Sequence, residues 1–270
     1  MHRIRVHATW CFGTIVATLL CASVSTASDI AYYIGGWDPG WYDERQFEDV
    51  SQIIANTEGL FSEVQTFDDE ALANFDAWAR SNLADGELDI IWLNGSMPSV
   101  LYPFPNLMPD GSLAELWLDD GNMIINTGGC FGILSYECGG ACEQNNFTGA
   151  ANILDLNEAV QKPGGPFFLR PTDAGMQYMP SIPARPATFR PIVPEEVTGD
   201  WELAAIFAQN TAGTQAEPCV LHNTQTDGYL AIINQSADFI WIDRASAVSE
   251  FLNLWMVEQT VGYSTTYPPS

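Results

Sequence analysis

The sequence predicts an α/β fold built on a doubly wound, mostly parallel sheet. Apolar strand-like runs alternate with helical periodicity through the first half of the chain, as they do in such sheets. The run at 88–94 is almost continuously apolar, which is typical of strands buried on both faces. Later in the chain, the turn-forming stretch 223–228 joins two further strand-like runs, so we expect a β-hairpin added to the sheet.

The elements of the first half follow from period and capping signals. Apolar residues at helical spacing distinguish the helices from the short apolar strands. Asp68 is a predicted N-cap, and Ser112 with Glu115 forms a capping box at the start of a helix. The expected elements are strands at 29–36, 61–67, 88–94 and 122–127, and helices at 45–56, 68–83 and 112–117.

The second half is less regular. Proline and glycine are frequent in 164–194, which predicts a long covering loop. The remaining expected elements are strands at 201–207, 218–222 and 229–234 and a last helix at 245–257. There is no internal repeat, so we expect one domain over 28–261 and a flexible tail over 262–270.

The first 27 residues have the features of a secretory signal peptide. Arg3 and Arg5 form a basic start, 11–24 is largely apolar, and Ser25-Thr26-Ala27 is a small-residue cleavage site. No later stretch approaches 18 uninterrupted apolar residues. The sequence therefore predicts a secreted or periplasmic protein that does not associate with a membrane after signal cleavage.

The charge of the chain is strongly acidic. It holds 34 Asp and Glu against nine Lys and Arg, a net charge of −25. Nucleic acids and anionic membranes require basic patches, so neither is expected as a partner. The acidic residues suit a solubilising surface; calcium binding is the alternative, although no loop of the D-x-D-x-D-G type is present. We expect no metal site and no cofactor.

Four of the six cysteines lie beyond the predicted signal peptide: Cys130, Cys138, Cys142 and Cys219. An even number in an oxidising compartment suggests disulfides, with three possible pairings. Cys138 and Cys142 could close a short loop, which would leave Cys130 with Cys219. That second disulfide would abolish any thiol chemistry at Cys130.

The most informative motif lies directly after the strand expected at 122–127. It reads Gly128-Gly129-Cys130-Phe131-Gly132, with glycines on both sides of a potential nucleophile. Glycine tolerates the crowded or positive-φ backbone of a sharp strand-to-helix turn, which would raise Cys130 at the carboxyl edge of the sheet. Open α/β folds place their sites at that edge, so the motif predicts a crevice there, with Cys130 as a catalytic thiol or the remnant of one.

Four stretches carry a resemblance to a known superfamily: 30–36, 88–96, 117–132, and 227–234 followed by the final helix. In order and content they resemble the class I glutamine amidotransferase-like superfamily, and within it the ThuA-like and biotin-protein-ligase N-terminal-like branches. The resemblance covers most of the chain beyond the signal peptide and implies a three-layer, flavodoxin-like fold. It also implies a nucleophile at Cys130, activated by the histidine of an H-x-E motif after the last sheet strand.

The histidine that this chemistry requires is missing from the expected place. A thiol near its free pKa is mostly protonated at neutral pH, so it needs an adjacent base. After 229–234 the sequence reads Asn234-Gln235-Ser236-Ala237-Asp238, and the only histidine beyond residue 27 is His222, one hairpin strand earlier. We therefore favour a domain without an intact Cys-His-Glu triad; the alternative is a hydrolase or amidase that uses Cys130 and His222.

The loops after the expected strands would converge on the crevice and could bind a small polar ligand, of which a carbohydrate is one class. Aromatic faces with Asp and Asn between them suit sugar rings, and the sugar metabolism associated with ThuA-like proteins supports that class by analogy. The candidate ligand-binding residues are Gly36, Trp37, Asp38, Trp41, Asn94, Gly95, Ser96, Gly129 and Glu137. Three alternatives remain open. Trp37 and Trp41 could only pack against their own loop, or Asp38, Asp43 or Glu44 could act as the acid and base of a glycoside hydrolase. The domain could also have a structural role without a small ligand.

Overall fold

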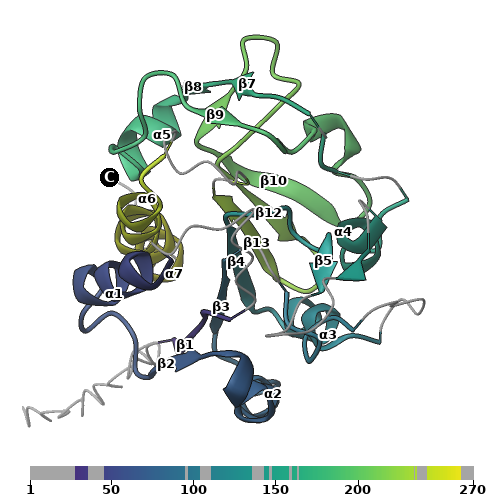
Figure 1. Ribbon diagram of the computed structural model, residues 1–270. Helices are drawn as coiled ribbons and strands as arrows, with labels where there is room; N and C mark the ends of the chain where they lie inside the picture. Colours follow the sequence, from purple (N-terminus) through teal and green to yellow (C-terminus); the bar gives the residue numbers. More distant parts are fainter. Residues whose placement is uncertain are drawn as a thin grey trace, which may run out of the picture.

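The computed structural model describes residues 28–35, 46–94, 97–103, 111–135, 143–145, 148–157, 160–162, 164–233, 235 and 242–262. A seven-stranded sheet with the order β10-β12-β13-β4-β3-β1-β2 organises this part of the chain (Figure 1). Strands β2, β1, β3, β4 and β13 are parallel, in the order of flavodoxin-like sheets. The predicted α/β class and doubly wound sheet are confirmed.

The hairpin predicted beside the parallel strands is also present. The strands of the sheet are β1 (Ile30–Tyr33), β2 (Val64–Phe67), β3 (Ile90–Leu93), β4 (Met123–Thr127), β10 (Trp201–Ile206), β12 (Cys219–Asn223) and β13 (Tyr229–Ile233). β12 pairs antiparallel with β13 and β10 pairs antiparallel with β12. β1, β3 and β4 are buried along their whole length, which agrees with their apolar sequences.

Helices cover both faces of the sheet and make three layers (Figure 1). One face carries α1 (Gln46–Asn56), α6 (Arg244–Glu250), the π-helical segment η4 (Phe251–Met256) and α7 (Val257–Gly262). The other carries α2 (Leu72–Ser81), α3 (Leu113–Asp119) and α4 (Thr148–Ile153). Because side chains alternate along a strand, Tyr32 packs in the core with Ile53 of α1, whereas Tyr33 packs against Phe75 of α2.

Both predicted helix starts are confirmed. The side chain of Asp68 accepts hydrogen bonds from the backbone N–H groups of Glu70 (3.0 Å) and Ala71 (3.1 Å), at the 3-10 turn η1 (Asp69–Ala71) before α2. Ser112 Oγ accepts from Glu115 N at 3.2 Å, and Glu115 Oε2 accepts from Ser112 N at 2.6 Å, so the capping box of α3 is complete. These local interactions satisfy backbone donors that a helix start leaves unpaired.

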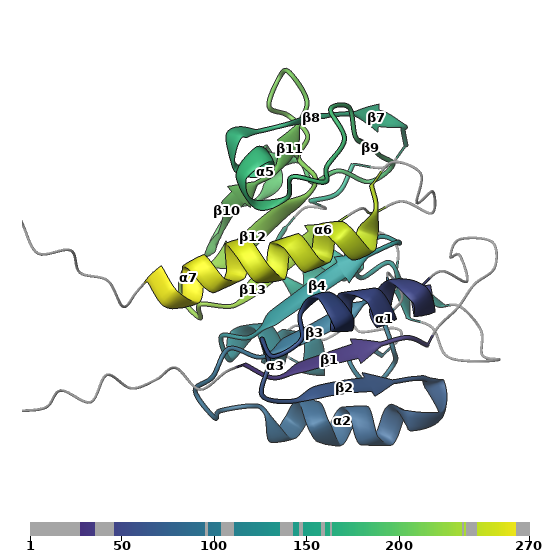
Figure 2. The same cartoon turned by 90° about the vertical axis from the view of Figure 1, so that its left-hand side faces the viewer.

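The expectation of a loop at 164–194 is wrong. This covering segment contains β7 (Phe167–Phe168), β8 (Arg170–Pro171), α5 (Asp173–Tyr178), β9 (Ala187–Thr188) and the start of the 3-10 turn η2 (Pro194–Glu196). β7 pairs with β9, and β8 pairs with β11 (Ala208–Gln209). Each element has two to six residues, too few for an apolar period to show in the sequence. In Figure 2 the segment lies beyond the β10 side of the sheet.

The last helical stretch is longer than expected. It begins after Asp243, whose side chain accepts from Ser246 N at 3.2 Å, and it continues through η4 and α7 to Gly262. None of the helices in the described ranges has the length and apolar character needed to cross a membrane. The predicted signal peptide and residues 263–270 lie outside the described residues.

Candidate functional site

The Gly128–Gly132 step lies at the carboxyl edge of the sheet, directly after β4. Gly128 and Gly132 have φ values of +88° and +73°, the left-handed region that favours glycine. A Cβ added to Gly149 would lie 1.9 Å from the carbonyl oxygen of Gly132, so the backbone of α4 packs directly on the step. The sequence therefore identified the positions of glycine-dependent backbone correctly.

The chain after this step does not form the expected strand-to-helix turn. Residues 131–133 form a turn, and β5 (Leu134–Ser135) then pairs with β6 (Glu143–Gln144) before α4 begins. Cys130 therefore does not precede a helix. Helix N-termini lower the pKa of cysteine thiols through the helix dipole, and this source of activation is missing here.

Cys130 is a buried thiol, with 9% of its surface exposed. Burial raises its pKa far above the ordinary value of a cysteine. The Arg190 guanidinium nearby lowers that pKa, but burial dominates, and the Glu217 carboxyl adds a smaller effect in the raising direction. The thiol is therefore protonated at neutral pH and is a poor nucleophile.

The backbone N–H of Phe131, next to Cys130, is already occupied. Phe131 N donates to Gln235 Oε1 at 2.8 Å, and Gln161 Nε2 donates to the same oxygen at 3.1 Å. Gln235 Nε2 in turn donates to the carbonyl of Arg190 at 2.7 Å. In nucleophile elbows the N–H after the nucleophile stabilises the oxyanion. Here a side-chain carbonyl fills that position.

Gln235 is held in place by a buried glutamate. Glu217 is 1% exposed; its Oε1 accepts from Gln235 N and its Oε2 accepts from Thr188 Oγ1 at 2.5 Å. Burial raises the pKa of Glu217 to about 8, partly offset by these two hydrogen bonds. We call Cys130, Gln161, Arg190, Glu217 and Gln235 the elbow cluster.

Arg190 completes the elbow cluster from the covering segment. Its Nη1 donates to the carbonyls of Gly164 (3.2 Å) and Phe189 (2.9 Å). The guanidinium is thus engaged by backbone oxygens while it lies near the Cys130 thiol. The polar groups of the cluster largely satisfy one another, which favours a fixed arrangement.

His222 lies at the opposite edge of the sheet. It pairs with Tyr229 in the hairpin, and Tyr229 pairs with Met123 at the start of β4. The four steps from Met123 to Thr127 correspond to about 13 Å along the strand, and Cys130 lies beyond Thr127. His222 instead contacts Asp227 (3.2 Å) and Glu202 (3.5 Å) and stacks on the Tyr229 ring. The structure does not bring His222 to Cys130.

Two predicted ligand-binding residues are described, and both are engaged within the protein. Asn94 is 1% exposed, and its Nδ2 donates to the carbonyl of Gly35 at 3.1 Å. This bond joins the ends of β1 and β3, the point where the strand order reverses. Gly129 is buried, and its carbonyl accepts from Asn126 Nδ2 at 2.8 Å. The other predicted residues lie outside the described residues: Gly36, Trp37, Asp38, Trp41, Gly95, Ser96 and Glu137.

The predicted alternative of a disulfide between Cys130 and Cys219 is wrong. Cys130 and Cys219 are both buried free thiols, so the disulfide between them is not formed. Burial also raises the pKa of Cys219 well above its ordinary value. Cys138 and Cys142 lie outside the described residues.

Sequence reasoning missed four members of the elbow cluster: Gln161, Arg190, Glu217 and Gln235. Gln235 follows the last parallel strand, where the resemblance implies a histidine, so its position in the sequence could have indicated a residue of the site. The other three come from irregular segments whose pairing is long-range, with sequence separations of 18 to 74 residues from Gln235. No local pattern indicates such contacts.

No protein-family model matches the sequence, and none of the curated proteins matches it. Among solved structures, a ThuA-like protein from Bacteroides uniformis ATCC 8492 is similar at 10% identity, over 85% of this chain and 91% of that one, with a TM-score of 0.39. The glutaminase domain of Trypanosoma brucei CTPS with bound acivicin is similar at 11% identity, over 89% and 96%, with a TM-score of 0.40. The fold assignment of this chain rests on its own strand order.

Proposed function

We propose that the protein is an exported, non-hydrolytic binding domain on an amidotransferase-like scaffold, which takes a small polar ligand at the carboxyl edge of its sheet. The hydrogen bond from Phe131 N to Gln235 Oε1 carries this proposal. It occupies the N–H that would stabilise an oxyanion, beside a buried thiol whose pKa is raised. A cysteine hydrolase needs an ionisable thiol and a free oxyanion donor, and this arrangement favours neither.

The ligand is proposed to lie over the point where β1 and β3 diverge. Open α/β sheets bind ligands in the crevice at such a switch point, and Asn94 already joins the two strand ends there. Trp37 and Trp41 stand in the sequence between β1 and α1. Stacking on aromatic faces suits sugars, so a carbohydrate is the ligand class that we propose.

Thiol reactivity tests the non-hydrolytic part of the proposal. Iodoacetamide labelling of the native protein at pH 7.5, resolved by peptide mass spectrometry, should modify Cys130 as slowly as the fully buried Cys219. Both should label rapidly after denaturation. Labelling of native Cys130 faster than glutathione in the same mixture would instead support a cysteine hydrolase.

A glycan array followed by calorimetry tests the binding part. Trp41→Ala should weaken binding of a retained sugar about tenfold or more, because it removes a stacking face. Leu254→Ala, at an exposed position on η4, should leave the affinity unchanged. Equal affinity of the two variants would show that the sugar does not stack on Trp41. N-terminal sequencing of the exported protein should begin at Ser28 if the signal peptide is cleaved as proposed.

A further inference from the structure

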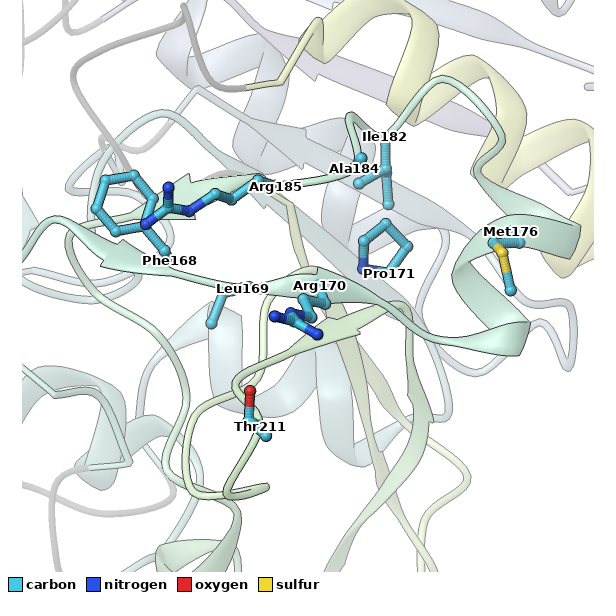
Figure 3. Close-up of a pocket in the computed structure, with 9 residues that line it drawn as sticks. All are labelled: Phe168, Leu169, Arg170, Pro171, Met176, Ile182, Ala184, Arg185 and Thr211. Atoms are coloured by element: carbon cyan, nitrogen blue, oxygen red, sulfur yellow. The ribbon is translucent and has the colours of Figure 1, made fainter.

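A groove of about 840 Å³ opens on the covering segment 164–194 and shares no lining residue with the elbow cluster. Its volume lies within the range of pockets that bind small organic molecules. Apolar side chains form much of the wall, among them Phe168, Pro171 and Met176 (Figure 3). Phe168 and Met176 are 43% and 63% exposed, so the apolar surface faces solvent.

Two arginines border this groove, Arg170 and Arg185. The whole chain has nine basic residues against 34 acidic ones, yet the described lining contains two of the former and none of the latter. In Figure 3 the side chain of Arg185 extends over Phe168, and Arg170 lies on the neighbouring strand, near Thr211. The described lining of the groove is therefore positively charged, although the chain as a whole is acidic.

The backbone places the two arginines at the same end of one strand pairing. β7 and β9 pair Phe168 with Ala187, and Leu169 N donates to the carbonyl of Pro186 at 2.8 Å, the last backbone bond of this pairing. Arg170 directly follows Leu169 and Arg185 directly precedes Pro186, so both arginines lie just beyond the end of this pairing. Like charges that border one groove repel each other. An anion between them would convert this repulsion into attraction.

Neither guanidinium has an ionic partner among the described residues. Arg80 pairs with Asp76 and Arg244 pairs with Asp49, whereas no such pair involves Arg170 or Arg185. The Arg185 guanidinium lies 4.1 Å from the centre of the Phe168 ring. Stacking uses the face of the guanidinium and leaves its in-plane N–H donors available for a carboxylate or phosphate.

We propose that this groove is a binding site for an amphipathic organic anion. The anionic head group lies between Arg170 and Arg185, and the apolar part lies against Phe168, Pro171 and Met176. A fully apolar ligand would leave the two like charges uncompensated, and a purely inorganic anion would leave the apolar wall exposed. The site is separate from the sheet-edge crevice, so it stands or falls independently of the proposed function.

Calorimetry with 4-phenylbutyrate tests the site, with 4-phenylbutyramide as a neutral probe of the same shape. The measurement uses about 0.15 M salt, where long-range repulsion from the acidic surface is largely screened. We expect saturable one-to-one binding of the acid and at least about tenfold weaker binding of the amide, because charge-assisted hydrogen bonds are lost. Phenyl phosphate in a parallel titration distinguishes a phosphate preference from a carboxylate preference.

The double variant Arg170→Gln/Arg185→Gln should weaken binding of the preferred anion about tenfold or more. Arg80→Gln removes one exposed arginine of α2 and is the matched control; it should leave binding unchanged. Unchanged circular dichroism and thermal midpoint establish that the variants fold. The proposal is overturned if neither anion saturates by about 10 mM, if the amide binds as well as the acid, or if the double variant binds like wild type.

Discussion

The elbow cluster and the groove bordered by Arg170 and Arg185 both contain residues of the covering segment 164–194, and they differ in how their polar groups are satisfied. Arg190 donates hydrogen bonds to two backbone carbonyls and lies near Cys130. Arg170 and Arg185 border a solvent-facing groove without an ionic partner among the described residues. The catalytic-looking motif Gly128–Gly132 has its backbone donor occupied by Gln235, whereas the covering segment keeps arginine donors available for a ligand.

The pH dependence of stability tests how deeply the elbow cluster is buried. The folded protein keeps the proton of Glu217 up to about pH 8, whereas the unfolded chain releases it near pH 4.5. Between these values the unfolded state binds fewer protons, so the free energy of unfolding falls as the pH rises, by about 4 kcal/mol from pH 5 to pH 8.

Glu217→Gln should remove most of that slope in urea titrations at several pH values. Asp89, whose pKa burial raises to about 7, acts in the same direction and should account for a residual slope. The exposed Glu58→Gln is the control and should retain the full slope. A wild-type stability that rises from pH 5 to pH 8 would contradict the burial of a neutral Glu217.

Gly149→Ala tests the close backbone contact beneath the elbow. Its Cβ would meet the Gly132 carbonyl oxygen at 1.9 Å, so α4 must move, at a cost on the order of 3 kcal/mol. Ala151→Gly in the same helix should cost only about 1 kcal/mol, the usual helix penalty of glycine. Equal losses in denaturant unfolding would mean that α4 is not fixed against Gly132.

Gln235→Ala tests whether the elbow is closed by this side chain. The change leaves Phe131 N and Gln161 Nε2 without their shared acceptor and should cost about 2 kcal/mol in denaturant unfolding. Iodoacetamide should also reach Cys130 faster in the variant. Gln225→Ala, at an exposed turn position, should change neither quantity. A variant as stable and unreactive as wild type would remove Gln235 from the elbow cluster.

Arg170→Gln should have the smallest effect, with the opposite sign. It removes one of the two like charges that border the groove and keeps the contact between Arg185 and Phe168, so it should stabilise the protein by about 0.5 kcal/mol. The gain should shrink at high salt, because screening already weakens the repulsion. A loss of stability in low-salt thermal unfolding would show that Arg170 has a stabilising partner and that the groove is not poised for an anion.

Local patterns predicted the framework of the sheet well. Continuous apolar runs indicated β1, β3 and β4, and the Asp68 and Ser112 caps marked the helix starts. The covering segment was misjudged as a loop because its elements are too short to show a period. The turn after Cys130 was expected to enter a helix, and the β5–β6 pairing replaced that helix with a strand.

The candidate site was predictable only in part. The glycine pattern located the elbow, because positive φ is a property of single residues. The state of Cys130 could not be read in this way, since it depends on Glu217, Arg190 and Gln235, which reach the elbow from distant parts of the chain.

The sequence alone indicated which segments form the strands, where the glycine-dependent elbow lies, and that no histidine stands where an amidotransferase-like triad would need one. Only the folded chain shows that Gln235 accepts a hydrogen bond from Phe131 N, that His222 lies at the far edge of the sheet, and that Arg170 and Arg185 border one groove. The reason is physical: backbone preference and apolar period act over a few residues. The pKa of a thiol and the partner of a guanidinium depend on groups that only folding brings together.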